Sequence, residues 1–113
     1  MEGFHIIIAR AIEASNKAAL ARWIADGRVD AGSCGGYMLE LRKGGVKGAK
    51  AFFAAAVSAG IVGHHEGFVR LPVPEGIRSQ NADITEDAFR AFRKVLDDAG
   101  LGAFVKRAWS YTD

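Results

Sequence analysis

An apolar stripe between Asp83 and Gly100 is the strongest folding signal in this chain. Asp83 and Glu86 form a D-x-x-E pair close to a capping box, and Gly100 follows the stripe as a C-cap. The stripe consists of residues at three- and four-residue spacing, namely Ala88, Phe89, Phe92, Val95, Leu96 and Ala99. This pattern predicts an amphipathic helix with one buried face, which needs another layer to pack against.

Hydrophobic periodicity also predicts the other elements of the chain. Apolar residues at helical spacing indicate a helix over 4–26 that ends at Gly27, or two helices divided at Ser15-Asn16. The remaining elements, in chain order, are a strand over 37–42, a short buried helix over 47–59, a hairpin over 61–73 that turns at Glu66-Gly67, a loop over 74–82, and a strand over 103–111.

After the N-terminal helix the predicted order is strand, helix, strand, strand, helix, strand. This is the βαββαβ pattern of ferredoxin-like folds, an α+β architecture with two helices on one face of an antiparallel sheet. We expect an N-terminal helical segment over 1–29, lying across the other face or an edge of the sheet, and a βαββαβ domain over 30–113. Together they would form one globular unit. A ferredoxin-like fold by itself carries little information about function.

The composition fits a folded protein of one domain. The chain has 113 residues, half of them hydrophobic and a quarter charged, with a net charge of +2. No stretch approaches the ~20 apolar residues of a membrane-spanning helix, and we identify no signal peptide, so we expect a cytoplasmic location and no membrane partner. Cys34 is the only cysteine, which excludes an internal disulfide and a cysteine-rich zinc site.

Four cations gather in the glycine-rich stretch 42–50, between a predicted strand and a predicted helix. They are Arg42, Lys43, Lys47 and Lys50, and the stretch contains no acidic residue. Helix N-termini bind anions through free N–H groups and the helix dipole, so this basic loop could seat a phosphate. Its spacing is not that of a P-loop. The alternative is a strand–helix turn with solvated lysines.

Other candidate residues lie in loops and in the hairpin. Gln80 and Asn81 precede the capped helix and could bind a ligand or satisfy loop backbone through their amides. Cys34 lies on a glycine-rich turn without a base nearby in sequence, and is either a nucleophile or a small buried residue. His64 and His65 are expected on opposite faces of the hairpin, so we predict no metal site.

The last predicted strand carries large aromatic residues. Alternation places Val105, Trp109 and Tyr111 on one face and Phe104 and Ala108 on the other. We expect Trp109 to be a core or sheet-face residue, and a binding patch is the alternative.

Two predicted strands resemble the sheet motifs of RNA-recognition modules, which stack bases on aromatic side chains: Tyr-Met-Leu-Glu-Leu at 37–41 and Gly-Phe-Val-Arg-Leu at 67–71. Side-chain parity argues against this assignment. If Tyr37 faced outward, Glu40 would face the core, where an unpaired carboxylate is very costly. We therefore expect Tyr37 and Leu39 to be buried and Glu40 to be exposed.

Several short pieces of the chain form an ordered set over residues 30–113. They are Asp30-x-x-x-Cys34-Gly35, Arg42, Lys47-x-x-Lys50-Ala51, Ser79-Gln80-Asn81-x-Asp83, the helix ending in Val95-Leu96, Gly102-Ala103-Phe104-Val105, and Asp113. Together these pieces resemble a group of small proteins encoded by tailed bacteriophages and prophages. The chain departs from the group at Tyr37 and in its last residues. The resemblance implies an origin in a mobile genetic element and no particular reaction.

We expect a non-enzymatic, phage-type accessory protein that acts by binding a protein of its bacterial host, such as a defence component, without a cofactor. The residues expected to bind are Arg42, Lys43, Lys47, Lys50, Gln80 and Asn81. One alternative is a nucleic-acid or nucleotide-phosphate binding module that uses the basic loop. Another is a small enzyme on phosphorylated or acyl substrates that uses Cys34 or His64. The sequence also leaves open whether the protein forms a homodimer.

Overall fold

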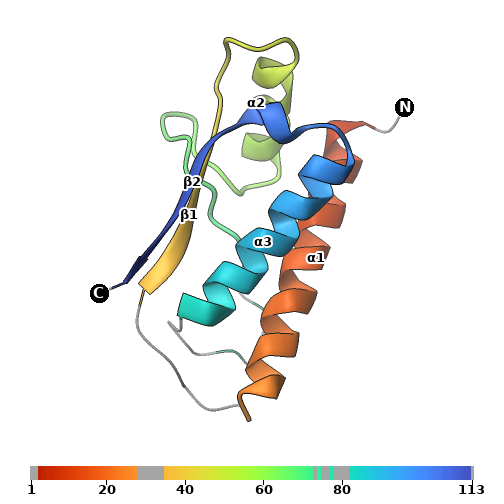
Figure 1. Cartoon of the computed structure of the whole chain (residues 1–113). Coiled ribbons are helices and arrows are strands. Elements are labelled where there is room, and N and C mark those ends of the chain that lie inside the picture. The colour runs from red at the N-terminus through yellow and green to blue at the C-terminus, as the bar shows by residue number, and fades with distance from the viewer. Residues whose placement is uncertain (1–2, 28–34, 73, 75–76, 78–81, 113) are drawn as a thin grey trace.

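The computed structural model describes residues 3–27, 35–72, 74, 77 and 82–112. Its elements are α1 (Phe4–Ala25), β1 (Gly35–Leu41), α2 (Ala49–Ser58), α3 (Ala82–Asp98), the short 3₁₀ helix η1 (Gly102–Phe104) and β2 (Val105–Thr112). Figure 1 shows β1 and β2 side by side as a ribbon, with α3 between this ribbon and α1. The long helices therefore stack on one side of a narrow sheet.

The sheet is an antiparallel pair of strands with one irregularity. Leu39 of β1 pairs with Ala108 of β2, and Glu40 pairs with Arg107. The register shifts directly after Glu40, where Lys106 is the extra residue of a β-bulge. The bulge changes which residues of β2 face the helices at its N-terminal end.

The other edge of β1 is partly occupied by an extended segment centred on Phe68. The Leu41 N–H donates to the Gly67 carbonyl oxygen at 2.8 Å, and the Val69 N–H donates to the Leu39 carbonyl oxygen at 2.8 Å. β1 is therefore the central strand, because it has hydrogen-bond partners along both of its edges.

The main core lies between the ribbon and the helices. Leu39 and Leu41 of β1 are fully buried there and face the helices. At the end of the core nearest α2, Phe4, Phe52 and Phe104 pack with ring centroids between 5.1 and 5.7 Å apart. These three rings come from α1, α2 and η1, so they join segments that are distant in sequence.

The three predicted helices are confirmed, with small shifts at their ends. α3 begins at Ala82, and Gly100 follows it with a φ of 78°. α1 runs without interruption through Ser15, whose hydroxyl donates to the Ile12 carbonyl oxygen at 2.7 Å. The alternative division at Ser15-Asn16 is therefore wrong, because the serine hydroxyl finds its partner within the helix.

The predicted ferredoxin-like βαββαβ fold is wrong: the described residues form three helices and a two-stranded antiparallel sheet. The error lies in the hairpin predicted over 61–73. Ile61 and Val62 are buried, but they follow α2 as an irregular loop. Among the described residues of 61–73, a single backbone hydrogen bond, Arg70 N–H to the Ile61 carbonyl oxygen at 2.7 Å, joins the two halves. Pro72 cannot donate to a ladder, so the extended segment ends early.

The position of α1 also differs from the expectation. α1 was expected across the second face or an edge of the sheet, but it packs against α3 and, near its N-terminus, against α2. The second face of the ribbon has no helix over it in the described part of the chain. None of the described helices combines the length and the apolar character needed to cross a membrane.

Candidate functional site

Two cations of the basic loop are held by backbone carbonyl groups. The Arg42 Nε donates to the Ala103 carbonyl oxygen at 3.0 Å, and the Lys43 Nζ donates to the His65 carbonyl oxygen at 2.7 Å. These hydrogen bonds tie the loop to the segment before β2 and to the turn at residues 64–65. Arg42 and Lys43 therefore fix the shape of the loop, whatever the loop binds.

The other two cations of the loop, Lys47 and Lys50, flank the first turn of α2. Both are exposed, and neither has an ion-pair or hydrogen-bond partner among the described residues. Gly48 precedes α2 with a φ of 88°, no side chain caps the helix, and its first turn has no acidic residue. The positive end of α2 is therefore not neutralised by any neighbouring side chain of this loop.

The side of the ribbon that faces away from the helices forms a second candidate surface, which we call the outer sheet face. Its residues are Met38, Glu40, Phe68, Arg107 and Trp109. The Trp109 indole is half-buried, with the Arg107 guanidinium 4.7 Å from its ring centroid and the Phe68 ring edge-on at 6.0 Å. Trp109 is thus held from two sides on a face that no described helix covers.

Glu40 of the outer sheet face lies beside two cations of β2, Arg107 and Lys106. Its Oε1 accepts a hydrogen bond from Arg107 Nε at 2.6 Å, and its Oε2 lies 4.0 Å from Lys106 Nζ. The predicted parity is confirmed, since Leu39 is buried and Glu40 faces the opposite side. The expected exposure of Glu40 is wrong: its side chain is only 14% exposed, because the two cations lie over it.

The bulge in β2 changes the predicted faces of this strand. Val105 was expected on the face of Trp109, but it pairs with Leu41 and is buried on the inner side. Tyr37, predicted to be buried, is half-buried on the inner side with its ring centroid 5.8 Å from that of Phe89. Simple alternation fails for Val105 because the extra residue of the bulge, Lys106, reverses the parity at the N-terminal end of β2.

The remaining sequence candidates are the histidines of the predicted hairpin and three residues of the predicted loops. His64 and His65 were predicted on the hairpin with their side chains on opposite faces, but both lie exposed in a turn. Cys34, Gln80 and Asn81 lie outside the described residues. Within the described ranges, no three His, Cys, Asp or Glu side chains come close enough together to hold a metal ion.

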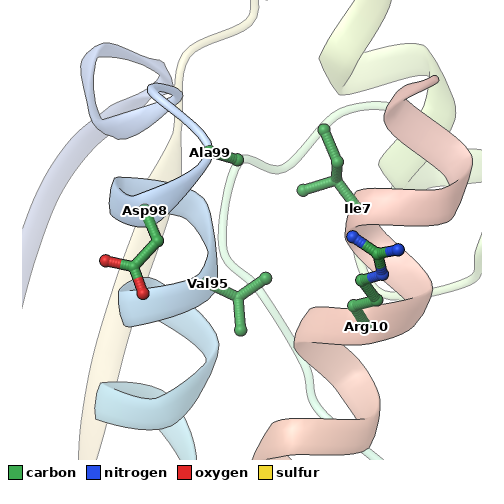
Figure 2. A pocket seen from close by; sticks show the side chains of 5 residues that line it. All are labelled: Ile7, Arg10, Val95, Asp98 and Ala99. Carbon is green, nitrogen blue, oxygen red and sulfur yellow. The ribbon is translucent and has the colours of Figure 1, made fainter. Parts of the chain in front are cut away.

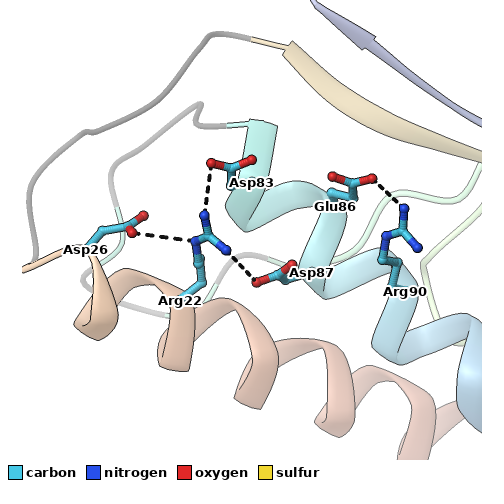
Figure 3. Close-up of polar contacts among 6 residues, drawn as sticks. All are labelled: Arg22, Asp26, Asp83, Glu86, Asp87 and Arg90. Carbon is cyan, nitrogen blue, oxygen red and sulfur yellow. Dashed lines mark hydrogen bonds and ion pairs between the residues drawn. The ribbon is translucent and has the colours of Figure 1, made fainter.

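Arg22 forms a charged cluster that the sequence analysis did not identify. From α1, its guanidinium lies 3.0 Å from Asp83 and 3.6 Å from Asp87 on α3, and 3.5 Å from Asp26 on its own helix (Figure 3). The cluster joins α1 to the start of α3. Asp83 is 61 residues away from Arg22, so no local pattern could have revealed this pairing.

Other charges on α3 pair within the helix at a spacing of four residues. Arg90 donates to Glu86 at 2.8 Å (Figure 3), and Lys94 donates to Asp98 at 2.9 Å. Each of these hydrogen bonds raises the pKa of its cation. Exposed pairs of this kind contribute little to stability.

A small pocket lies between α1 and the C-terminal end of α3. It is lined by Ile7 and Arg10 from α1 and by Val95, Asp98 and Ala99 from the chain around the end of α3 (Figure 2). Its volume is about 220 Å³, below the ~300–1,000 Å³ that is usual for small-molecule sites. We therefore regard it as a groove between helices and not as a ligand site.

No protein-family model, curated protein or solved structure matches this chain.

Proposed function

We propose that this protein acts without catalysis, by binding another protein through the outer sheet face. The position of Trp109 carries the proposal: the indole is half-buried, is held between Arg107 and Phe68, and lies on a face that no described helix covers. Trp and Arg are enriched among the residues that contribute most to protein–protein binding. A side chain that is already held in place also loses less entropy when a partner binds.

The free edge of β2 favours a partner with an extended, acidic segment. β2 pairs with β1 along one edge, and no other described strand lies along its second edge. Such an edge can accept an extended segment of another chain through backbone hydrogen bonds. Lys106 and Arg107 are both exposed on β2 and share the single carboxylate of Glu40. Their surplus positive charge disfavours pairing between two β2 edges and favours an acidic partner.

Replacing Trp109 with alanine tests this proposal. The resemblance to phage-encoded proteins supports a partner from the bacterial host, so we would capture proteins from a host lysate on the immobilised wild-type chain. We expect Trp109→Ala to weaken binding of the captured protein by about 30-fold or more, as is usual for a central interface residue. Lys94→Ala on α3 is the control and should bind like the wild type. The proposal is wrong if the wild type retains no protein, or if Trp109→Ala retains it equally well.

A second candidate function, binding of a nucleic-acid or nucleotide phosphate, is favoured by the start of α2. Lys47 and Lys50 are exposed beside an uncapped helix N-terminus. Arg42 and Lys43 hold the loop through backbone carbonyl groups, so a phosphate would meet a shaped loop. Backbone N–H groups and ammonium groups are the ligands that phosphate prefers.

Reversing the two free charges tests the phosphate candidate. Binding of single-stranded RNA or ATP to the wild type should weaken with salt. For the RNA, we expect a logarithmic slope of about 0.7 for each phosphate neutralised. The Lys47→Glu/Lys50→Glu double variant should show no measurable binding, whereas Lys94→Glu on α3 should bind like the wild type. Affinities that do not depend on salt, or that survive the double reversal, would exclude the basic loop as a phosphate site.

A further inference from the structure

The outward side of α1 carries exposed residues at alternating spacings of four and three. α1 buries Ile8, Ala11, Ser15 and Ala19, and its opposite side forms the flank of the molecule farthest from the strands (Figure 1). Alternating spacing of this kind is that of the contact positions in a coiled coil. We call this set the outer seam; it consists of Ile6, Arg10, Glu13, Lys17, Leu20 and Ile24.

The two ends of the outer seam are apolar. Ile6, Leu20 and Ile24 are 51%, 43% and 48% exposed, respectively, and are the three most exposed large apolar side chains that the structure describes. Single exposed apolar residues need no explanation. Here, Leu20 and Ile24 lie one turn apart, and Ile6 lies on the same helix face at the other end. The 22 residues of α1 span about 33 Å, so the apolar ends lie far apart and need a partner of similar length.

The centre of the outer seam is charged and complementary to itself. Glu13 and Lys17 are both exposed, with Oε1 and Nζ 3.2 Å apart. If two copies of α1 run antiparallel around a two-fold axis that crosses the outer seam at the height of residue 15, Glu13 of each copy meets Lys17 of the other. A parallel pair would instead place Glu13 against Glu13 and Lys17 against Lys17, which is unfavourable.

The same antiparallel register also matches the ends of the seam. Ile6 of each copy lies opposite Ile24 of the other, so apolar residues meet at both ends. Arg10, whose side chain also lines the groove between α1 and α3, lies opposite Leu20, which the alkyl part of the arginine side chain can cover. All six positions of the seam are therefore matched by one register.

We propose that two copies of this chain associate through the outer seam of α1 as an antiparallel, two-fold symmetric pair. The charge pattern favours a second copy over a lipid surface, because a membrane would have to accommodate Glu13 in the middle of the seam. The pair leaves the outer sheet face open, since α1 and the ribbon lie on opposite sides of α3. The proposal is therefore independent of the proposed function.

Charge reversal at the centre of the seam tests the pair by sedimentation velocity. Across about 1–100 μM, the range of a modest interface, the wild type should shift from monomer to dimer. Glu13→Lys and Lys17→Glu should each raise the dissociation constant by about tenfold or more, because each places four like charges at the centre of the pair. An equimolar mixture of these two variants should dimerise again, since every lysine then meets a glutamate.

The control is Arg90→Glu, which reverses an exposed charge of a similar pair on α3 and should dimerise like the wild type. Circular dichroism of each variant checks that α1 is still folded. A wild type that stays monomeric over the whole range overturns the proposal. So does a dimer that tolerates both reversals, or a mixture of the two variants that stays monomeric.

Discussion

Replacing Phe52 with alanine is expected to lower the free energy of unfolding by about 3–5 kcal/mol. Phe52 is fully buried on α2, and its ring packs against the rings of Phe4 and Phe104. The substitution removes a large apolar surface and leaves a cavity where three segments meet, and a packed interior closes such a cavity only in part. Urea unfolding followed by circular dichroism measures the change.

Phe68→Ala is the matched control, because the chemical change is the same and the position differs. Phe68 is half-buried on the outer sheet face, where its ring contacts Trp109. We expect it to reduce stability by about 1 kcal/mol, near the average for single substitutions. If Phe52→Ala destabilised no more than Phe68→Ala, the three-ring cluster would not be a centre of the core.

Replacing Gly48 with alanine has the second largest expected effect. Gly48 has a φ of 88°, which costs an L-residue about 1–2 kcal/mol. Its added Cβ would also lie 3.0 Å from the Phe104 Cζ, so the ring would have to move within the core. We therefore expect a loss of stability above the conformational cost alone, measured by urea unfolding.

Two neighbouring glycines separate these contributions. Gly45 has a φ of 84° and open space around it, so Gly45→Ala should show only the conformational cost. Gly44 has neither a positive φ nor a close neighbour, so Gly44→Ala should be neutral or stabilise by up to about 1 kcal/mol. Equal effects at Gly48 and Gly45 would mean that Phe104 does not pack against the loop.

The helices could be predicted from the sequence, and the number of strands could not. The stripe that includes Phe89, Phe92 and Leu96 has helical spacing over about three turns, and no other local structure fits it. The residues around Val69 also alternate, and Ile61 and Val62 form a short apolar run, but short patterns of this kind report burial and not strand pairing. Ile61 and Val69 are both buried, but neither belongs to β1 or β2. Their apolar pattern predicts two further strands, and the ferredoxin-like prediction depends on those strands.

The candidate surfaces were predictable only in part. The charge of the basic loop is visible in the sequence, but only the structure shows that Arg42 and Lys43 are held by carbonyl groups while Lys47 and Lys50 are not. For Trp109, the sequence leaves two alternatives open: a core or sheet-face residue, or part of a binding patch. The choice depends on which face α1 covers, and this is a matter of packing between distant segments that local periodicity does not encode.

The outer seam of α1 could have been recognised from its spacing. Ile6, Leu20 and Ile24 do not follow the stripe that faces the core, so the helix is apolar on more than one side. Helical spacing alone does not divide the apolar residues of this helix between two faces. The structure separates the two faces because it shows which residues pack against α3.

Acrylamide quenching of Trp109 fluorescence is the most direct measurement of whether a partner protein covers the outer sheet face. The chain has two tryptophans, so Trp23→Phe leaves Trp109 as the sole emitter. We predict ready quenching in the chain alone and strong protection once the captured protein is added to saturation. An indole that is already shielded without the partner, or quenching that the partner leaves unchanged, would contradict this account.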